Sequence, residues 1–197
     1  MKAVILFLAL TLLFGGCATQ YKTVLPKVHA NYFRRMAVVP FSTGRYHGSR
    51  AGVDIADGIQ TKLAENIPQM ELVERGRLDA IISEHRLTRS GIIDVRTAVT
   101  IGRLCGAKVI MTGQIKNINV VRARQVMYGS LRVSVRIIDV ERGLIKWATE
   151  VKIKHPGPWS RYSAYQSYTG KDEFKADMIE LASAQVAKKF YTHKEKI

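Results

Sequence analysis

The sequence LRVSVRIIDVERGLIKWATEVKI, residues 131–153, decides the fold of this chain. Apolar and polar residues alternate from 131 to 137 and again from 145 to 153, the period of half-buried β-strands. Between the two runs lies DVERG, residues 139–143, whose Asp and Gly favour a turn. The stretch therefore predicts an antiparallel hairpin with one buried face.

Buried strands and helices are predicted upstream of this hairpin. Residues 108–118 form an apolar run typical of a strand buried on both faces, and residues 36–41 form a shorter run. Between these runs, apolar residues spaced by three or four predict three helices. We expect the helices at 54–67 with Asp54 as cap, at 77–88, and between the cap Asp94 and the stop Gly106, with a short strand at 71–74.

A closing amphipathic helix is predicted at 172–191, followed by a basic tail at 192–197. The expected order is strand, helix, strand, helix, helix, strand, hairpin and helix. Such an order predicts an α/β fold, in which helices cover a mixed β-sheet. Residues 36–191 are enough for one such domain with a proper core.

The start of the chain, MKAVILFLALTLLFGGC, is typical of a secretory signal. Its uncharged run, residues 3–14, is shorter than the roughly 20 apolar residues that a membrane-spanning helix needs. The ending Leu-Phe-Gly-Gly-Cys resembles a bacterial lipobox, although Phe14 is atypical there. The resemblance implies that residues 1–16 are removed and that Cys17 is lipidated. An ordinary secretory signal or a buried N-terminal helix is the alternative.

Residues 17–35 are expected to form a tether that starts at the lipidated Cys17, and Ala18 is compatible with sorting to the outer membrane. An alternative is that Tyr32 and Phe33 pack on the domain. The chain has a formal net charge of +15, which in a cytosolic protein would indicate nucleic acid. Behind a signal peptide we expect no nucleic-acid partner, and predict a lipid-anchored protein that faces the periplasm and binds envelope proteins.

No motif indicates catalysis, a metal or a cofactor. The five histidines are not at metal-ligand spacing, and no nucleophile elbow, phosphate-binding loop or dinucleotide fingerprint is present. Cys105 lies on the apolar face of a predicted helix, where we expect a buried thiol that packs as a small hydrophobic group. His85 has a similar position, and we expect a partly buried imidazole. The chain is therefore predicted not to be an enzyme.

Two sets of surface residues are candidate binding sites. Aromatic residues recur at every third position within PGPWSRYSAYQSY, and such rings suit a partner-binding surface or packing over an open sheet edge. This predicted partner-binding set is Trp159, Tyr162, Tyr165 and Tyr168. Arginines along the strand region suggest a positive sheet face that binds anions, with a solvated face as the alternative. This predicted anion-binding set is Arg122, Arg124, Arg132 and Arg136, with Lys146, Lys152 and Lys154 nearby.

Four segments in this order resemble the curli-secretion (CsgG-like) lipoprotein family and its relatives in envelope assembly. The segments are MAVVPF at 36–41, LVERGRLDAIISEHRLTRSGIID at 72–94, TAVTIGRLCGAKVIMTGQI at 97–115 and VRIIDVERGLIKWATEV at 135–151. The resemblance implies a mixed α/β periplasmic domain. For the curli channel it also implies a ring-shaped oligomer, to which each subunit adds two membrane-spanning hairpins.

The chain departs from the curli channel where those hairpins should be inserted. Each spanning strand needs about 9 to 11 residues, so residues 119–130 are too few for a pair. Residues 154–171 are interrupted by Pro156 and Pro158. We therefore predict the periplasmic domain without the pore.

The leading expectation is a non-catalytic outer-membrane lipoprotein that binds a partner during secretion or assembly of an envelope or surface polymer. Two alternatives stay open. The chain is a subunit of a homo-oligomeric secretion pore, or it regulates a peptidoglycan synthase as some related lipoproteins do.

Overall fold

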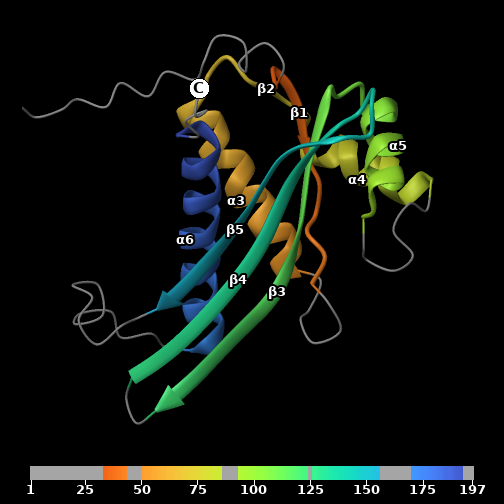
Figure 1. Ribbon diagram of the computed structural model, residues 1–197. Helices are drawn as coiled ribbons and strands as arrows, with labels where there is room; N and C mark the ends of the chain where they lie inside the picture. Colours follow the sequence, from red (N-terminus) through yellow and green to blue (C-terminus); the bar gives the residue numbers. More distant parts are fainter. Residues whose placement is uncertain (1–32, 44–49, 86–92, 124–125, 156–169, 193–197) are drawn as a thin grey trace, which may run out of the picture.

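The computed structural model describes residues 33–43, 50–85, 93–123, 126–155 and 170–192. Its helices and strands follow one another in the predicted order (Figure 1). The elements are β1 (Arg35–Val38), α3 (Arg50–Asn66), β2 (Glu71–Leu72), α4 (Arg75–Glu84), α5 (Val95–Cys105), β3 (Val109–Ala123), β4 (Val126–Asp139), β5 (Ile145–His155) and α6 (Lys171–Tyr191).

The five strands form one mixed sheet in the order β2-β1-β3-β4-β5. β1 is parallel to both β2 and β3, whereas β3, β4 and β5 are antiparallel neighbours. In the turn between β4 and β5, Asp139 Oδ1 accepts hydrogen bonds from the backbone N–H groups of Glu141 and Arg142, and Gly143 has a φ of 66°. The α/β fold and the predicted hairpin are therefore confirmed.

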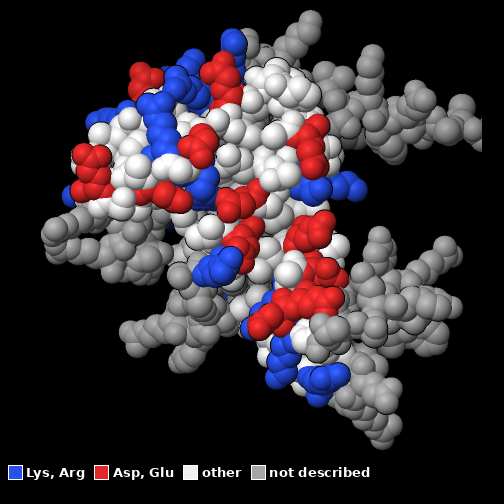
Figure 2. All heavy atoms as spheres, turned by 180° about the vertical axis from the view of Figure 1, so that it is seen from behind, with Lys and Arg blue, Asp and Glu red and all other residues white. Residues whose placement is uncertain are grey.

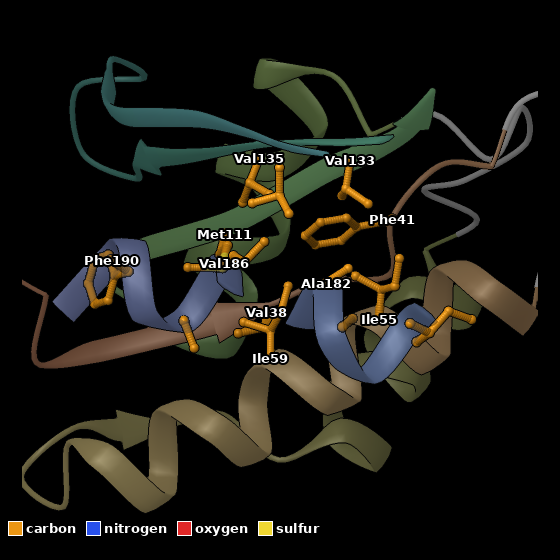
Figure 3. Close-up of a cluster of buried hydrophobic side chains, with 14 of the residues drawn as sticks. Val38, Phe41, Ile55, Ile59, Met111, Val133, Val135, Ala182, Val186 and Phe190 are labelled. Carbon is orange, nitrogen blue, oxygen red and sulfur yellow. The ribbon is translucent and has the colours of Figure 1, made fainter. Parts of the chain in front are cut away.

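Helices α3 and α6 pack side by side on one face of the sheet and form the larger core with it. Figure 3 shows Ile55 and Ile59 of α3 and Val186 of α6 pointing toward Val133 and Val135 of the sheet. All of these side chains are buried. The fourfold apolar spacing of α3 and the alternation of β4 thus meet in a single core.

Phe33 also belongs to this core. Its ring contacts the ring of Phe190 at a centroid distance of 5.4 Å, in an edge-to-face arrangement. The alternative in which Tyr32 and Phe33 pack on the domain is therefore confirmed for Phe33, while Tyr32 lies outside the described residues. Since β1 follows at Arg35, the expected tether 17–35 is too long at its end.

Helices α4 and α5 cover only one end of the opposite face, beside β1 and the turn between β4 and β5. Their buried side chains, such as Leu78 and Ile101, form a second core with Ile110 and Ile138. Asp94 caps α5 by accepting a hydrogen bond from the N–H of Thr97, and Gly106 ends α5 with a φ of 71°. These two predictions are confirmed, as is the burial of Cys105.

Three local predictions are wrong. α3 begins at Arg50, so Asp54 is an exposed residue within the helix and does not cap it. The early start follows from a tertiary contact, since the N–H of Phe41 donates to the carbonyl of Gly52. α4 begins at Arg75 because Glu74 accepts hydrogen bonds from the N–H groups of Gly76 and Arg77. α4 ends at Glu84, so His85 is exposed.

β3 and β4 form a longer hairpin than the sequence predicts. Their pairing extends from Val109 opposite Asp139 to Ala123 opposite Val126, with a β-bulge at Lys116. Before the bulge the odd-numbered residues of β3 face α3 and α6; after it the even-numbered residues Ile118 and Val120 do. The expectation of a strand at 108–118 buried on both faces holds as far as Thr112 and is wrong from Gln114 on, because Gln114 and Lys116 are exposed.

None of the helices in the described ranges is both long enough and apolar enough to span a membrane.

Candidate functional site

The face of β3, β4 and β5 that α4 and α5 leave uncovered carries rows of polar side chains. Residues directly opposite each other on neighbouring strands share one face of a sheet. The register therefore aligns Gln114, Ser134 and Glu150 in one row, and Asn117, Arg132 and Lys152 in the next. We call this surface the open face. It comprises Gln114, Lys116, Asn117, Arg132, Ser134, Arg136, Glu150, Lys152 and Lys154.

A hollow of about 520 Å³ lies at the end of the open face nearest to α5. Gln114, Ser134 and Glu150 contribute to its lining on the sheet side, and Ile93, just before α5, contributes to its wall. Arg136 fixes this arrangement, because its Nη2 donates a hydrogen bond of 3.0 Å to the carbonyl oxygen of Ile93. The hollow therefore joins the open face to the start of α5.

The Glu150 carboxylate lies among three cations on the open face. Lys116 Nζ is 2.9 Å from Glu150 Oε2, while Arg132 Nε and Lys152 Nζ are 3.7 Å and 3.6 Å from Oε1. The hydrogen bond from Lys116 lowers the pKa of the Glu150 carboxyl, and the charges of Lys116, Arg132 and Lys152 lower it further. Glu150 is thus ionised at neutral pH.

Helix α6 helps to position this carboxylate. Lys189 Nζ donates a hydrogen bond of 2.8 Å to the backbone carbonyl oxygen of Glu150. This contact joins the edge strand β5 to α6 at Glu150, the residue whose carboxylate contacts the three cations.

The positive charge of the open face exceeds what Glu150 can balance. Arg132 and Lys152 stand directly opposite each other, an arrangement that is destabilising for like charges. Both side chains are more than half exposed. Guanidinium and ammonium groups beside amides and hydroxyls form charge-assisted hydrogen bonds with carboxylates, so this surface is suited to binding anionic groups.

The tip of the β3–β4 hairpin adds an apolar contact to the same side of the sheet. Val121 and Tyr128 stand opposite each other and are 51% and 40% exposed. The pair is two rows beyond Arg132 along the hairpin. An exposed aromatic residue beside an aliphatic one is typical of a protein contact point.

The opposite side of the molecule has a different charge pattern. Figure 2, which views the molecule from behind Figure 1, shows Asp and Glu side chains gathered along the middle of this side. Helix α6, for example, has Asp172 and Glu173 in its first turn. This side therefore has clustered carboxylates, whereas three cations surround the single carboxylate Glu150 on the open face.

The structure brings together half of the predicted anion-binding set. Arg132 and Arg136 lie on the open face, four residues apart on β4. Arg122 pairs with Met127, whose side chain is in the larger core, so Arg122 belongs to the other face of the hairpin. Arg124 lies outside the described residues, as do Cys17 and the aromatic set Trp159, Tyr162, Tyr165 and Tyr168, which stay predictions.

Sequence reasoning missed the residues at the centre of the open face. The apolar run at 108–118 predicts a buried Lys116, and the alternation at 145–153 does not distinguish Glu150 from the other polar residues. No local signal marks the bulge at Lys116, which depends on how β3 pairs with β4.

In the described part of the chain, no group of three His, Cys, Asp or Glu residues is placed to hold a metal ion.

Solved structures that share the fold of this chain include PelC and lipoprotein GNA1162. PelC from Paraburkholderia phytofirmans, solved as a dodecamer, is 14% identical with a TM-score of 0.51, covering 82% of this chain and 89% of PelC. Lipoprotein GNA1162 from Neisseria meningitidis is 10% identical with a TM-score of 0.52, covering 78% of this chain and 97% of GNA1162. The C-terminal domain of LpoB from Escherichia coli is 17% identical with a TM-score of 0.44, covering 61% of this chain and 82% of that domain.

Among curated proteins, none matches the chain significantly. The model of one family, the peptidoglycan-synthase activator LpoB, matches residues 53–153, which are 101 of the 197 residues. This match overturns the resemblance to the curli-secretion family, whose quoted segments lie largely within the same residues. Their pattern of strand, two helices and strand follows from the α/β fold of this chain and does not by itself identify a family. The chain belongs to the peptidoglycan-synthase activator LpoB family.

Proposed function

We propose that this chain is a lipid-anchored envelope protein whose α/β domain binds and activates a peptidoglycan synthase. The observation that carries the proposal is the family match over residues 53–153, which extends from α3 into β5 and includes most of the open face. Of the functions expected from the sequence, the family favours the regulator of a peptidoglycan synthase over the secretion of a surface polymer.

The anchor is the second part of the proposal. Lipidation of Cys17 would hold the chain at the outer membrane, and removal of residues 1–16 would leave the domain facing the periplasm. The 15 residues between Cys17 and Phe33 span up to roughly 50 Å when extended. It would allow the domain to reach a synthase bound to peptidoglycan without leaving the membrane.

Activation implies a non-catalytic role, in which binding energy favours an active conformation of the synthase. An activator must bind that conformation more tightly than the resting one, because equal affinity for both would leave the equilibrium between them unchanged. The exposed charges and the apolar pair at the hairpin tip supply groups for such a contact.

A reconstituted assay tests the function. The lipidated chain and a peptidoglycan synthase from the same cell are incorporated into liposomes with lipid-linked disaccharide-pentapeptide, and glycan polymerisation is followed. We expect a severalfold higher rate than with the synthase alone, and no increase with chain that has been heat-unfolded beforehand. An unchanged rate, with no co-purification of the two proteins from detergent, would exclude the proposed function.

A further inference from the structure

Resting on the proposed function, we propose that the open face docks an acidic protein surface of the synthase, and that Glu150 competes internally for the cations that bind it.

The first step is the charge balance around Glu150. One carboxylate contacts Lys116, Arg132 and Lys152, and each of these side chains is 46% to 63% exposed. A single carboxylate thus contacts three cations whose side chains are still partly exposed to solvent. Two positive charges stay uncompensated by this contact, and they attract further carboxylates.

The second step is the opposition of Arg132 and Lys152 on neighbouring strands. Like charges that face each other weaken a sheet, so this pair lowers the stability of the free domain. Glu150 reduces the repulsion only partly, because it lies more than 3.5 Å from both cations. A partner carboxylate placed between the two would relieve the repulsion and gain two charge-assisted hydrogen bonds.

The third step identifies the occupant. The cations are held in register with Gln114, Asn117 and Ser134 across three strands, and the exposed pair Val121 and Tyr128 continues the same side. A surface that combines an ordered polar array with one aromatic contact fits a folded protein better than mobile lipid head groups. Charge complementarity requires that this protein surface be acidic.

Glu150 then has a specific effect on binding. Its carboxylate occupies the cations in the free domain, and an incoming carboxylate must share or displace it. Replacing Glu150 by Gln keeps the size of the side chain and removes the competing charge. The variant should therefore bind an acidic surface more tightly than the wild type, whereas a purely structural Glu150 would give no gain in affinity.

The experiment measures the affinity of the full chain for the purified synthase at two salt concentrations, with three variants. Glu150→Gln should tighten binding, by severalfold at low salt. The double variant Arg132→Gln with Lys152→Gln should weaken it about tenfold, since each exposed charge pair contributes up to a few-fold. Lys62→Gln with Lys188→Gln on α3 and α6 removes the same charge from the helix layer and should leave the affinity unchanged.

The outcomes separate this inference from the proposed function. If the wild type binds and activates the synthase but the double variant does so equally well, the open face is not the docking site and the proposed function stands. If the wild type does not bind, the proposed function fails and this inference with it. If the double variant binds the synthase normally but loses binding to vesicles of phosphatidylglycerol and phosphatidylethanolamine, the face binds lipid and the inference is overturned.

Discussion

Gly113 lies where β3 passes beneath Phe41, and the ring of Phe41 occupies the space that a side chain would need. A Cβ atom at residue 113 would lie 2.4 Å from Phe41 Cε2 and 2.4 Å from the carbonyl oxygen of Ser134. Neither atom can give way easily, because Phe41 is buried and Ser134 is held in the neighbouring strand.

We therefore expect Gly113→Ala to lower the free energy of unfolding by about 1 to 3 kcal/mol. Chemical denaturation of the purified domain measures this change. Gly170→Ala is the control, since no described atom lies within 4 Å of its added Cβ. Gly170 is the N-cap of α6, where Ala is less favourable than Gly, so this variant should cost up to about 1 kcal/mol. Equal stability of the two variants would contradict the steric argument.

Asp94 makes a second residue-scale prediction, which concerns pH. The backbone hydrogen bond from Thr97 lowers the pKa of the Asp94 carboxyl below its ordinary value of 3.8. A carboxyl group whose pKa is lower in the folded state stabilises the fold above its ordinary pKa, and this contribution is lost as the pH falls through the lowered value.

Asp94→Asn should therefore melt at a lower temperature than the wild type at pH 7, and the gap between the two should close as the pH falls below about 3.8. Thermal melts followed by circular dichroism from pH 7 to pH 2.5 measure the gap. A gap that stays constant over this range would show that the charge of Asp94 does not stabilise α5.

At the scale of elements, the periodicity of apolar residues predicts the order of the helices and strands correctly. The alternation in β4 and β5 and the cap and stop of α5 were readable, because each depends on neighbours in the chain. The start of α3 was not, since it depends on the contact of Gly52 with the backbone of Phe41. The full length of β3 was missed because the bulge breaks its alternation.

Helix α6 determines how firmly the hairpin is held against the helix layer. Phe174 is fully buried, and together with Met178 it packs against Gly129, near the tip of the hairpin. Leu181 lies on the same helix but is 43% exposed.

We expect Phe174→Ala to destabilise the domain by about 3 to 5 kcal/mol, since it leaves a large cavity beneath the hairpin. Leu181→Ala should change the stability by less than about 0.5 kcal/mol. Urea denaturation monitored by fluorescence compares the two variants, and hydrogen exchange of residues 127–131 should accelerate only in Phe174→Ala. Similar losses in both variants would refute the assigned role of Phe174.

At the scale of the whole molecule, the sequence predicted a basic sheet face but not its composition. Residue type and position along the chain mark the arginines as candidates, yet only the sheet register places Arg132 beside Lys152 and Arg122 on the opposite side. The centre of the site, Lys116 with Glu150, joins residues 34 positions apart. No local pattern predicts such a pair.

The attachment of the whole molecule to a membrane gives a further prediction, and the two cysteines allow a matched comparison. Cells grown with an alkyne analogue of palmitate should label the wild-type chain and not Cys17→Ser. Cys105→Ser should label normally, because Cys105 is fully buried in α5 and its Sγ contacts the carbonyl of Gly102. Label retained in Cys17→Ser would disprove the lipid anchor.

At the bulge, β3 could be one residue shorter without a change in the fold, because Lys116 has no partner residue on β4. Removing Lys116 would leave Ile115, Asn117 and Ile118 opposite Val133, Arg132 and Leu131, as in an uninterrupted ladder. Every other side chain of β3 would stay on the same face of the sheet. The fold therefore does not require Lys116. Removing Ile118 would instead turn Asn119 toward the larger core and Val120 toward water. Among relatives, a one-residue gap at this position would therefore mark the loss of a cation from the open face, while the fold is retained.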